Sequence, residues 1–177
     1  MILAPYDPAW ATEFSNIERL LVETLRDHVV RVEHVGSTAV PGLRAKPILD
    51  IDIVIPNYEG FPAVVDGLRR LGYIHNGDQG IAEREAFNRE DEFTPWTEPR
   101  KSWMNHHLYV CPAYGEELRR HVKFRDVLRA RADLRKDYEE MKLCIENRAN
   151  GDRKIYAQIK EAECRAFVEK VLKEGEA

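Results

Sequence analysis

The chain has 177 residues, of which 44% are hydrophobic and 33% charged, and its formal net charge at pH 7 is -4. These values are typical of a soluble globular protein, and the length predicts one domain with an appended helical part. The mean hydropathy of -0.51 and the lack of an apolar run of about 18 residues exclude a transmembrane helix. The negative net charge argues against a general nucleic-acid-binding surface.

The first residues and the cysteines both favour the cytoplasm. The N-terminus has neither the basic segment nor the apolar segment of a signal peptide. The three cysteines, Cys111, Cys144 and Cys164, are far apart and form no Cys-x-x-Cys motif. A disulfide framework or a structural zinc site is therefore not expected, and the reducing cytosol fits.

The first 55 residues are predicted to form a helix followed by two strands. Asp7 and Pro8 are suited to begin a helix. Apolar residues then recur at helical spacing; they are Trp10, Phe14, Ile17, Leu21 and Leu25. Residues 29–35 and 48–55 have the apolar patterns of strands, with a turn-rich segment between them.

The segment between these strands carries groups that suit phosphate binding. Gly36 permits a sharp turn or a close approach of backbone to ligand. Backbone N–H groups there, with the hydroxyls of Ser37 and Thr38, can cradle a phosphate, and Lys46 can neutralise its charge. An ordinary turn, a helix cap and a solvated lysine are the alternatives, and no Walker A pattern is present.

Two aspartates on the second strand suggest a metal site. Side chains alternate across a strand, so Asp50 and Asp52 share one face, roughly 6.5–7 Å apart, while Leu49, Ile51 and Ile53 face a core. Carboxylates at this spacing repel each other unless a cation or a basic group lies between them. Mg²⁺ takes oxygen ligands and keeps room for substrate phosphates. The alternative is the solvated polar face of an edge strand.

The rest of the chain is predicted to complete a sheet and then to become helical. Residues 61–71 have helical spacing, and strands are expected at residues 73–74, 85–89 and 105–111. The polar segment 91–102 is interpreted as a hairpin connection or a mobile loop near the site. From Ala113 onward, three apolar stripes predict three helices with core-packing faces. The first stripe consists of Tyr114, Leu118, His121, Phe124 and Leu128.

Several motifs together indicate a family. They are Gly36-Ser37-Thr38-Ala39-Val40-Pro41-Gly42-Leu43, Lys46-Pro47-Ile48, Asp50-Ile51-Asp52, His107-Leu108-Tyr109-Val110, Phe124-Arg125-Asp126-Val127-Leu128-Arg129, Tyr138 with Lys142, and Tyr156 with Lys160. This set resembles the GrpB family, a domain also fused to the C-terminus of some dephospho-CoA kinases. The resemblance implies a single GrpB-like domain over residues 1–177 with an α+β, polymerase-β-like nucleotidyltransferase fold. Residues 1–112 would form its mixed-sheet core, and residues 113–177 its appended C-terminal helices.

This chain departs from the nucleotidyltransferase pattern at the third carboxylate, which that superfamily normally supplies from a later strand. Here the strand 105–111 offers His106 and His107, and the family's second strand histidine is Tyr109. Histidine is a poor Mg²⁺ ligand, but it binds transition metals and acts as an acid or base. The candidate replacement carboxylates are Glu85, Asp91 and Glu92.

These observations predict a metal-dependent nucleotidyltransferase that uses a nucleoside triphosphate and an unknown hydroxyl acceptor. Asp50 and Asp52 would hold Mg²⁺ or Mn²⁺, and His107 would be a further catalytic residue. The predicted nucleotide- or phosphate-binding residues are Gly36, Ser37, Lys46 and Arg84. Arg84 resembles a family arginine whose guanidinium suits phosphate, although a surface salt bridge is its alternative role.

Two other functions remain open from the sequence. One is a non-catalytic nucleotide-binding, phosphate-binding or folding-accessory domain, for which a protein partner is expected. The other is a transition-metal hydrolase built on His106, His107 and the two aspartates.

Overall fold

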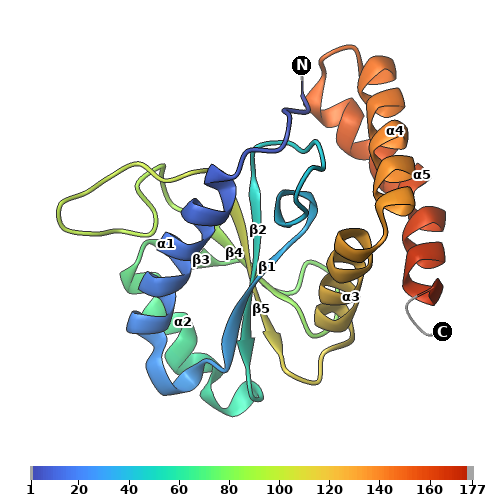
Figure 1. Ribbon diagram of the computed structural model, residues 1–177. Coiled ribbons are helices and arrows are strands. Elements are labelled where there is room, and N and C mark those ends of the chain that lie inside the picture. The colour runs from blue at the N-terminus through green and yellow to red at the C-terminus, as the bar shows by residue number, and fades with distance from the viewer. Residues whose placement is uncertain (1, 175–177) are drawn as a thin grey trace.

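The computed structural model describes residues 2–174 and places five strands in one sheet with helices on both sides (Figure 1). The strands are β1 (Arg31–Val35), β2 (Leu49–Ile55), β3 (Tyr73–His75), β4 (Glu85–Arg89) and β5 (His106–Pro112). The α-helices are α1 (Ala9–Leu25), α2 (Phe61–Arg70), α3 (Glu116–Ala130), α4 (Ala132–Ala149) and α5 (Arg153–Glu174). Short 3-10 turns include η2 (Ser37–Ala39), directly after β1.

The sheet is mixed, and its register brings chemically active side chains together. The strand order is β1-β2-β5-β4-β3, with β2 and β5 parallel and the other neighbours antiparallel. Asp50 lies opposite His107, and Asp52 lies opposite Tyr109. Because paired residues on neighbouring strands share a face, these four side chains project from the same side of the sheet.

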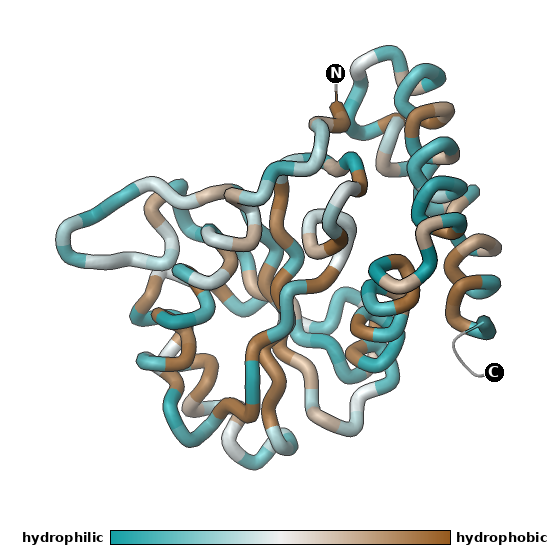
Figure 2. The backbone as a smooth tube through the Cα atoms, in the orientation of Figure 1, coloured by the Kyte–Doolittle hydropathy of each residue, from teal (hydrophilic) through white to brown (hydrophobic). Residues whose placement is uncertain are grey.

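The other side of the sheet packs against α1 and α2. Ile17 and Leu21 of α1 form one hydrophobic cluster with the β2 residues Ile51 and Ile53 and with Leu108 of β5. All five side chains are almost fully buried, and Figure 2 shows the hydrophobic colouring that runs through the strands and these two helices. This alternation of an apolar face with a polar one is what the spacing of the two aspartates predicts.

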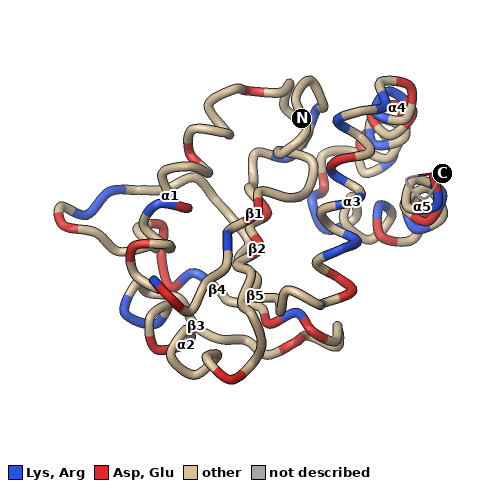
Figure 3. Tube along the Cα trace, turned by 60° about the horizontal axis from the view of Figure 1, so that its bottom comes forward, with Lys and Arg blue, Asp and Glu red and all other residues tan. Residues whose placement is uncertain are grey.

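The C-terminal helices build a second, separate hydrophobic cluster. It includes Tyr138, Ile145 and Phe167 from α4 and α5, together with Val40 and Leu43 from the segment after η2. Figure 3 shows Lys and Arg mixed with Asp and Glu along α4 and α5, so neither helix has an outer surface of one charge sign. Among residues 2–174, no helix is long and apolar enough to cross a membrane.

Buried polar contacts fix the C-terminal helices to the turn region. Arg125 of α3 donates hydrogen bonds to Glu33 Oε2 at 2.6 Å and to the carbonyl of His34 at 3.0 Å. Arg129 donates to the carbonyl of Ala39 at 2.9 Å. These contacts hold α3 beside the end of β1, where η2 begins.

The structure confirms the predicted α+β class, the mixed sheet and the appended C-terminal helices. The predicted strands are all present: β4 has the predicted ends, and the ends of the other strands differ by at most two residues. One predicted helical stripe is partly wrong. Tyr114 lies before α3 with 51% of its surface exposed, and His121 makes ion pairs instead of packing in an apolar core.

Candidate functional site

The turn after β1 lies directly against Asp50. Gly36 has a φ of +70°, and a Cβ atom built on it would lie 2.1 Å from Asp50 Oδ2. A side chain at this position would therefore both strain the backbone and collide with the carboxylate. Glycine is required here because it lets Asp50 approach the backbone of the turn.

Asp50 also forms an ion pair with His107 across the β2–β5 boundary. The distance from His107 Nδ1 to Asp50 Oδ1 is 2.9 Å, with side-chain exposures of 56% and 34%. This hydrogen bond raises the pKa of His107 above its usual value, although burial opposes the charged ring. Because a carboxylate only accepts, Nδ1 carries the proton in this pair, and Nε2 is the acceptor of the neutral ring.

A cavity of about 330 Å³ lies between this pair and the C-terminal helices. Its walls include Ser37, Thr38, Lys46, Ile48, Asp50 and His107 from the turn and the sheet, and Lys142, Tyr156 and Lys160 from α4 and α5. We call it the lysine cavity. The Nζ atom of Lys142 donates to the carbonyl of Arg44 and lies 3.4 Å from Ser37 Oγ. The Nζ atom of Lys46 lies 4.4 Å from the centre of the Tyr156 ring.

The charge of Lys160 acts on the other two lysines of this cavity, whereas its own pKa is raised because Tyr138, and after it Tyr156 and Asp50, outweigh the effect of burial. Burial and then the charge of Lys160 lower the pKa of Lys142 to about 7. The same two causes lower the pKa of Lys46. Within the described part of the chain, no carboxylate lies within 4.0 Å of any of these three ammonium groups. An anion in the cavity would relieve this repulsion, so the site is suited to phosphate.

Asp52 has a different environment from Asp50. It is wholly buried, and its Oδ2 lies 2.7 Å from Nδ1 of His121 on α3. The other ring nitrogen of His121 lies 3.2 Å from Glu117 Oε1. Burial disfavours the imidazolium, but the hydrogen bonds to the two carboxylates outweigh burial and raise the pKa of His121 to about 10. Burial raises the pKa of Asp52, and the hydrogen bond and charge of His121 oppose that rise, so His121 is the counter-charge of Asp52.

The two aspartates do not fit a shared divalent ion in this arrangement. His121 already supplies a positive charge to Asp52, and Asp52 lines neither the lysine cavity nor the larger cavity described below. Asp52 Oδ1 is buried without a hydrogen-bond partner, but the side chains needed to complete a ligand set are missing around it. Among residues 2–174, no group of three or more His, Cys, Asp or Glu residues is placed to hold a metal ion.

His106 lies on the opposite side of β5 from His107. Its Nε2 lies 2.7 Å from the Tyr73 hydroxyl, and its Nδ1 lies 2.8 Å from the carbonyl of Met104. Burial lowers its pKa to about 4, so it is a neutral histidine within the structure. A metal site that uses both histidines is therefore excluded by the alternation of side chains along the strand.

The candidate replacement carboxylates also lie elsewhere. Glu85 pairs with His75 at 2.7 Å, and Asp91 accepts from the backbone of Phe93 at 2.9 Å. Glu92 accepts from the Ser102 hydroxyl at 3.3 Å. None of the three lines the lysine cavity.

The structure thus brings together part of the predicted site. Ser37, Lys46, Asp50 and His107 line one cavity, and Gly36 lies against Asp50. Arg84 lines neither that cavity nor the second one. Its guanidinium lies over the Tyr109 ring at 4.4 Å, with Nε buried and without a hydrogen-bond partner.

Two pairs of residues contribute to the site in ways that the sequence patterns alone do not predict. Lys142 and Lys160 appear in the sequence only as parts of Tyr-x-x-x-Lys motifs on helices, with no indication that they share a cavity. Glu117 and His121 have the i, i+4 spacing that puts side chains on one helix face. That spacing gives no sign that the face lies over Asp52.

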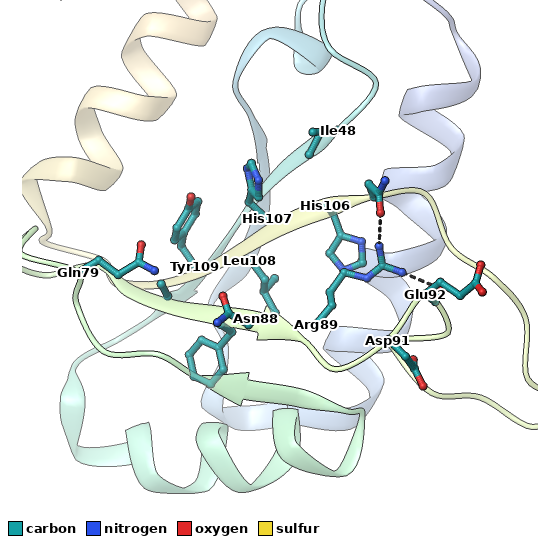
Figure 4. A pocket seen from close by; sticks show the side chains of 13 residues that line it. Ile48, Gln79, Asn88, Arg89, Asp91, Glu92, His106, His107, Leu108 and Tyr109 are labelled. Carbon is teal, nitrogen blue, oxygen red and sulfur yellow. Dashed lines mark hydrogen bonds between the residues drawn. The ribbon is translucent and has the colours of Figure 1, made fainter. Parts of the chain in front are cut away.

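A second cavity of about 790 Å³ lies over β4 and β5, and Ile48 and His107 belong to both cavities. Figure 4 shows His107 and Tyr109 on one side of β5, with Asn88 on the neighbouring strand and Gln79 near the far end. We call this space the amide cavity because its accessible polar side chains include Asn88, Gln79 and Asn105.

Comparisons with known proteins agree on one family. The family model described as "GrpB protein" matches residues 1–174. The chain is 28% identical to the UPF0157 protein YqkA of Bacillus subtilis, over 77% of this chain and 37% of that protein. It is also 28% identical to a dephospho-CoA kinase of Mycolicibacterium paratuberculosis, over 90% of this chain and 43% of the kinase. The chain therefore spans less than half the length of either relative.

The structural comparisons agree with this result. The crystal structure of the conserved protein GrpB from Enterococcus faecalis matches with a TM-score of 0.78 and 27% identity, over 98% of this chain and 96% of that chain. Cid1 in complex with the UTP analogue UMPNPP matches with a TM-score of 0.41 and 11% identity, over 71% of this chain and 39% of that chain. The second likeness is too distant to bear on the function of this chain.

Proposed function

This chain belongs to the GrpB family, and from that premise we propose that it binds the phosphates of a nucleoside triphosphate in the lysine cavity and transfers the nucleotidyl group to a hydroxyl acceptor. One observation carries the proposal. Three lysines that have no carboxylate within 4.0 Å in residues 2–174 line a cavity whose wall also contains the Asp50–His107 pair and Glu161.

The lysine cavity supplies the groups that a polyphosphate needs. Lys46, Lys142 and Lys160 offset its negative charge, and the hydroxyls of Ser37 and Thr38 are additional hydrogen-bond donors. Bound phosphate would also raise the lowered pKa of Lys142, because the anion favours the charged ammonium. Asp50 already favours the charged form of Lys160, and a bound phosphate would add charge compensation for Lys46 and Lys142, whose pKa values are lowered.

His107 is placed to accept a proton at the edge of this cavity. Asp50 holds its Nδ1–H, which leaves Nε2 as the acceptor in the neutral ring. In the proposed step, the acceptor oxygen bonds to the α-phosphorus as its proton passes to His107 Nε2. The bond from the α-phosphorus to the bridging oxygen breaks, and pyrophosphate leaves with its charge balanced by the lysines.

No part of this step is assigned to a metal ion, because Asp52 is neutralised by His121 and closed off from the cavity. The Mg²⁺ or Mn²⁺ expected from the sequence stays a prediction, and so does the cytoplasmic location. Binding measurements with EDTA and with added Mg²⁺ would test the need for the ion directly.

A second candidate function is phosphate binding without turnover. It is favoured by Tyr109, which lies opposite Asp52 on the strand expected to supply a third carboxylate. The relative named dephospho-CoA kinase also supports an accessory role, because less than half of its length matches this chain.

Calorimetry with inorganic tripolyphosphate would test the binding proposal. Lys160→Met is expected to weaken binding at least tenfold, because one hydrogen bond to a charged group contributes about 1.5–3 kcal/mol. Lys170→Met is the matched control, since Lys170 is an exposed lysine on the same helix and lies outside the cavity. Absence of tripolyphosphate binding by the wild-type protein would refute the proposal.

Pyrophosphate release would then separate the two candidate functions. If the protein transfers nucleotidyl groups, His107→Gln should retain ATP binding but lose pyrophosphate release in the presence of a hydroxyl acceptor such as glycerol. If wild-type protein binds ATP and releases no pyrophosphate with any of a panel of small alcohols and sugars, the non-catalytic function is favoured.

A further inference from the structure

We infer that the amide cavity binds the nucleoside half of the same nucleoside triphosphate, with its base recognised by Asn88 and Gln79. This inference rests on the proposed function, since it assumes that phosphates occupy the lysine cavity. It adds the part of the ligand that phosphate binding leaves unspecified.

The two cavities meet at His107. Ile48 and His107 line both of them, so a ligand that fills the lysine cavity reaches the amide cavity directly past His107. Asn88 directly follows Phe87, whose pairing with Leu108 is the last of the β4–β5 register, so Asn88 projects from the same face of the sheet as His107. Asp50, His107 and Asn88 thus form a row across the sheet that leads from one cavity into the other.

The two cavities differ in the chemistry that they offer. The lysine cavity is cationic, whereas the amide cavity contains no lysine. Arg89, the one arginine that lines it among residues 2–174, already donates to the carbonyls of Glu92 and Thr94 and to Asn105 Oδ1, at 2.7, 3.1 and 2.9 Å. A second polyphosphate would find little charge compensation here, so the cavity suits a neutral polar group.

The wall of the amide cavity is built by specific contacts. The Arg89 hydrogen bonds tie the start of the 91–105 segment to its end. Asp91 accepts from the indole nitrogen of Trp96 at 3.2 Å, and Glu92 accepts from Ser102 at 3.3 Å. The charged side chains at this rim therefore hydrogen-bond within the wall of the cavity. The amides of Asn88 and Gln79 are left to bind a ligand.

A nucleobase matches the side chains that remain. Asn88 and Gln79 are exposed and make no side-chain hydrogen bond to any described residue, and each carries a donor and an acceptor. An amide pairs with the adjacent acceptor and donor of adenine, N7 and the N6 amino group. The Tyr109 ring also lines the cavity; the Arg84 guanidinium covers one of its faces, and the other face is the aromatic surface on which a base can stack. We therefore expect adenine to bind more tightly than the pyrimidines.

Comparing ATP with tripolyphosphate isolates the contribution of the nucleoside. In calorimetry, wild-type protein should bind ATP at least tenfold more tightly than tripolyphosphate, and more tightly than CTP or UTP. Asn88→Leu should abolish the advantage of ATP and leave tripolyphosphate affinity unchanged, whereas Lys160→Met should weaken both ligands. Asn147→Leu is the matched control, because Asn147 is an exposed asparagine on α4, outside both cavities.

The outcomes separate this inference from the proposed function. If ATP and tripolyphosphate bind equally well, or if Asn88→Leu keeps the full advantage of ATP, the nucleoside does not occupy the amide cavity, while phosphate binding stands. If neither ligand binds, the proposed function fails and this inference fails with it. Unchanged tripolyphosphate affinity in Asn88→Leu also verifies that the variant is folded.

Discussion

Replacing His121 by leucine is expected to destabilise the fold strongly. The change would leave the Asp52 carboxylate buried without its ion-pair partner, which lies 2.7 Å away in the wild-type protein. Asp52 has no exposed surface, so water cannot replace the lost contact. Removing one partner of a buried pair typically costs about 3–5 kcal/mol. For a chain of this size, that loss corresponds to a decrease in Tm of roughly 6–20 °C.

A double-mutant cycle by urea unfolding would measure the pair directly. Asp52→Asn combined with His121→Leu removes both charges, so the double variant should be more stable than His121→Leu alone. A loss below about 1 kcal/mol in His121→Leu would refute the argument that the pair is buried and charged. A stabilisation of the wild-type protein by Mn²⁺ that disappears in Asp52→Asn would contradict the conclusion that Asp52 is not a metal ligand.

The pH dependence of the same variant gives a second test. The pKa of His121 is about 10 in the folded protein and near 6.5 when unfolded, so the folded state binds the extra proton between these values. The contribution is complete below pH 6.5 and is lost as pH rises towards 10. The stability difference between wild type and His121→Leu should therefore shrink from pH 7 to pH 10. A difference that stays constant over this range would show that His121 is not protonated.

Three further predictions concern the turn, the neutral histidine and the ion pair between Arg125 of α3 and Glu33 of β1. Gly36→Ala should weaken tripolyphosphate binding at least tenfold in calorimetry, because its Cβ would lie 2.1 Å from Asp50 Oδ2; unchanged affinity would contradict this. Since the pKa of His106 is about 4, the stability that it contributes above pH 6.5 is lost as pH falls towards 4, by about 3 kcal/mol at most. Urea unfolding at pH 7 and pH 4 should show a smaller loss for His106→Gln than for wild type. Arg125→Met should cost about 3 kcal/mol in urea unfolding because its ion pair with Glu33 is largely buried, whereas Arg148→Met, which breaks an exposed pair, should cost much less; equal losses would refute the difference in burial.

Local sequence patterns predicted the helices and strands of this fold and the part of the site that the turn and the sheet supply. The i, i+2 spacing of Asp50 and Asp52 placed both on one face of a strand, and the Gly36 turn lies against the first of them, as a close backbone approach requires. The identical spacing also suggested that the two aspartates act together. That joint role stays a prediction; in the structure their partners differ, since Asp50 lines the lysine cavity, whereas Asp52 pairs with His121 of α3.

The partners of Asp52 depend on packing over a long stretch of chain. His121 and Asp52 are separated by 69 positions, and their contact depends on how α3 lies across the sheet. Helical periodicity fixes which residues share a face but does not fix what that face covers. The same reasoning applies to Lys142 and Lys160, whose helices have to pack on the turn before the lysine cavity exists.

The lysine cavity lies at the junction of the two hydrophobic clusters. Asp50 and His107 belong to the sheet that packs on α1 and α2, whereas Lys142 and Tyr156 belong to helices that pack in the second cluster. Without a ligand, repulsion between the lysine charges weakens the packing at this junction. We therefore expect α4 and α5 to unfold at lower urea concentrations than the sheet. A polyphosphate that contacts both sides would join them, so its binding should convert two unfolding steps into a single cooperative transition.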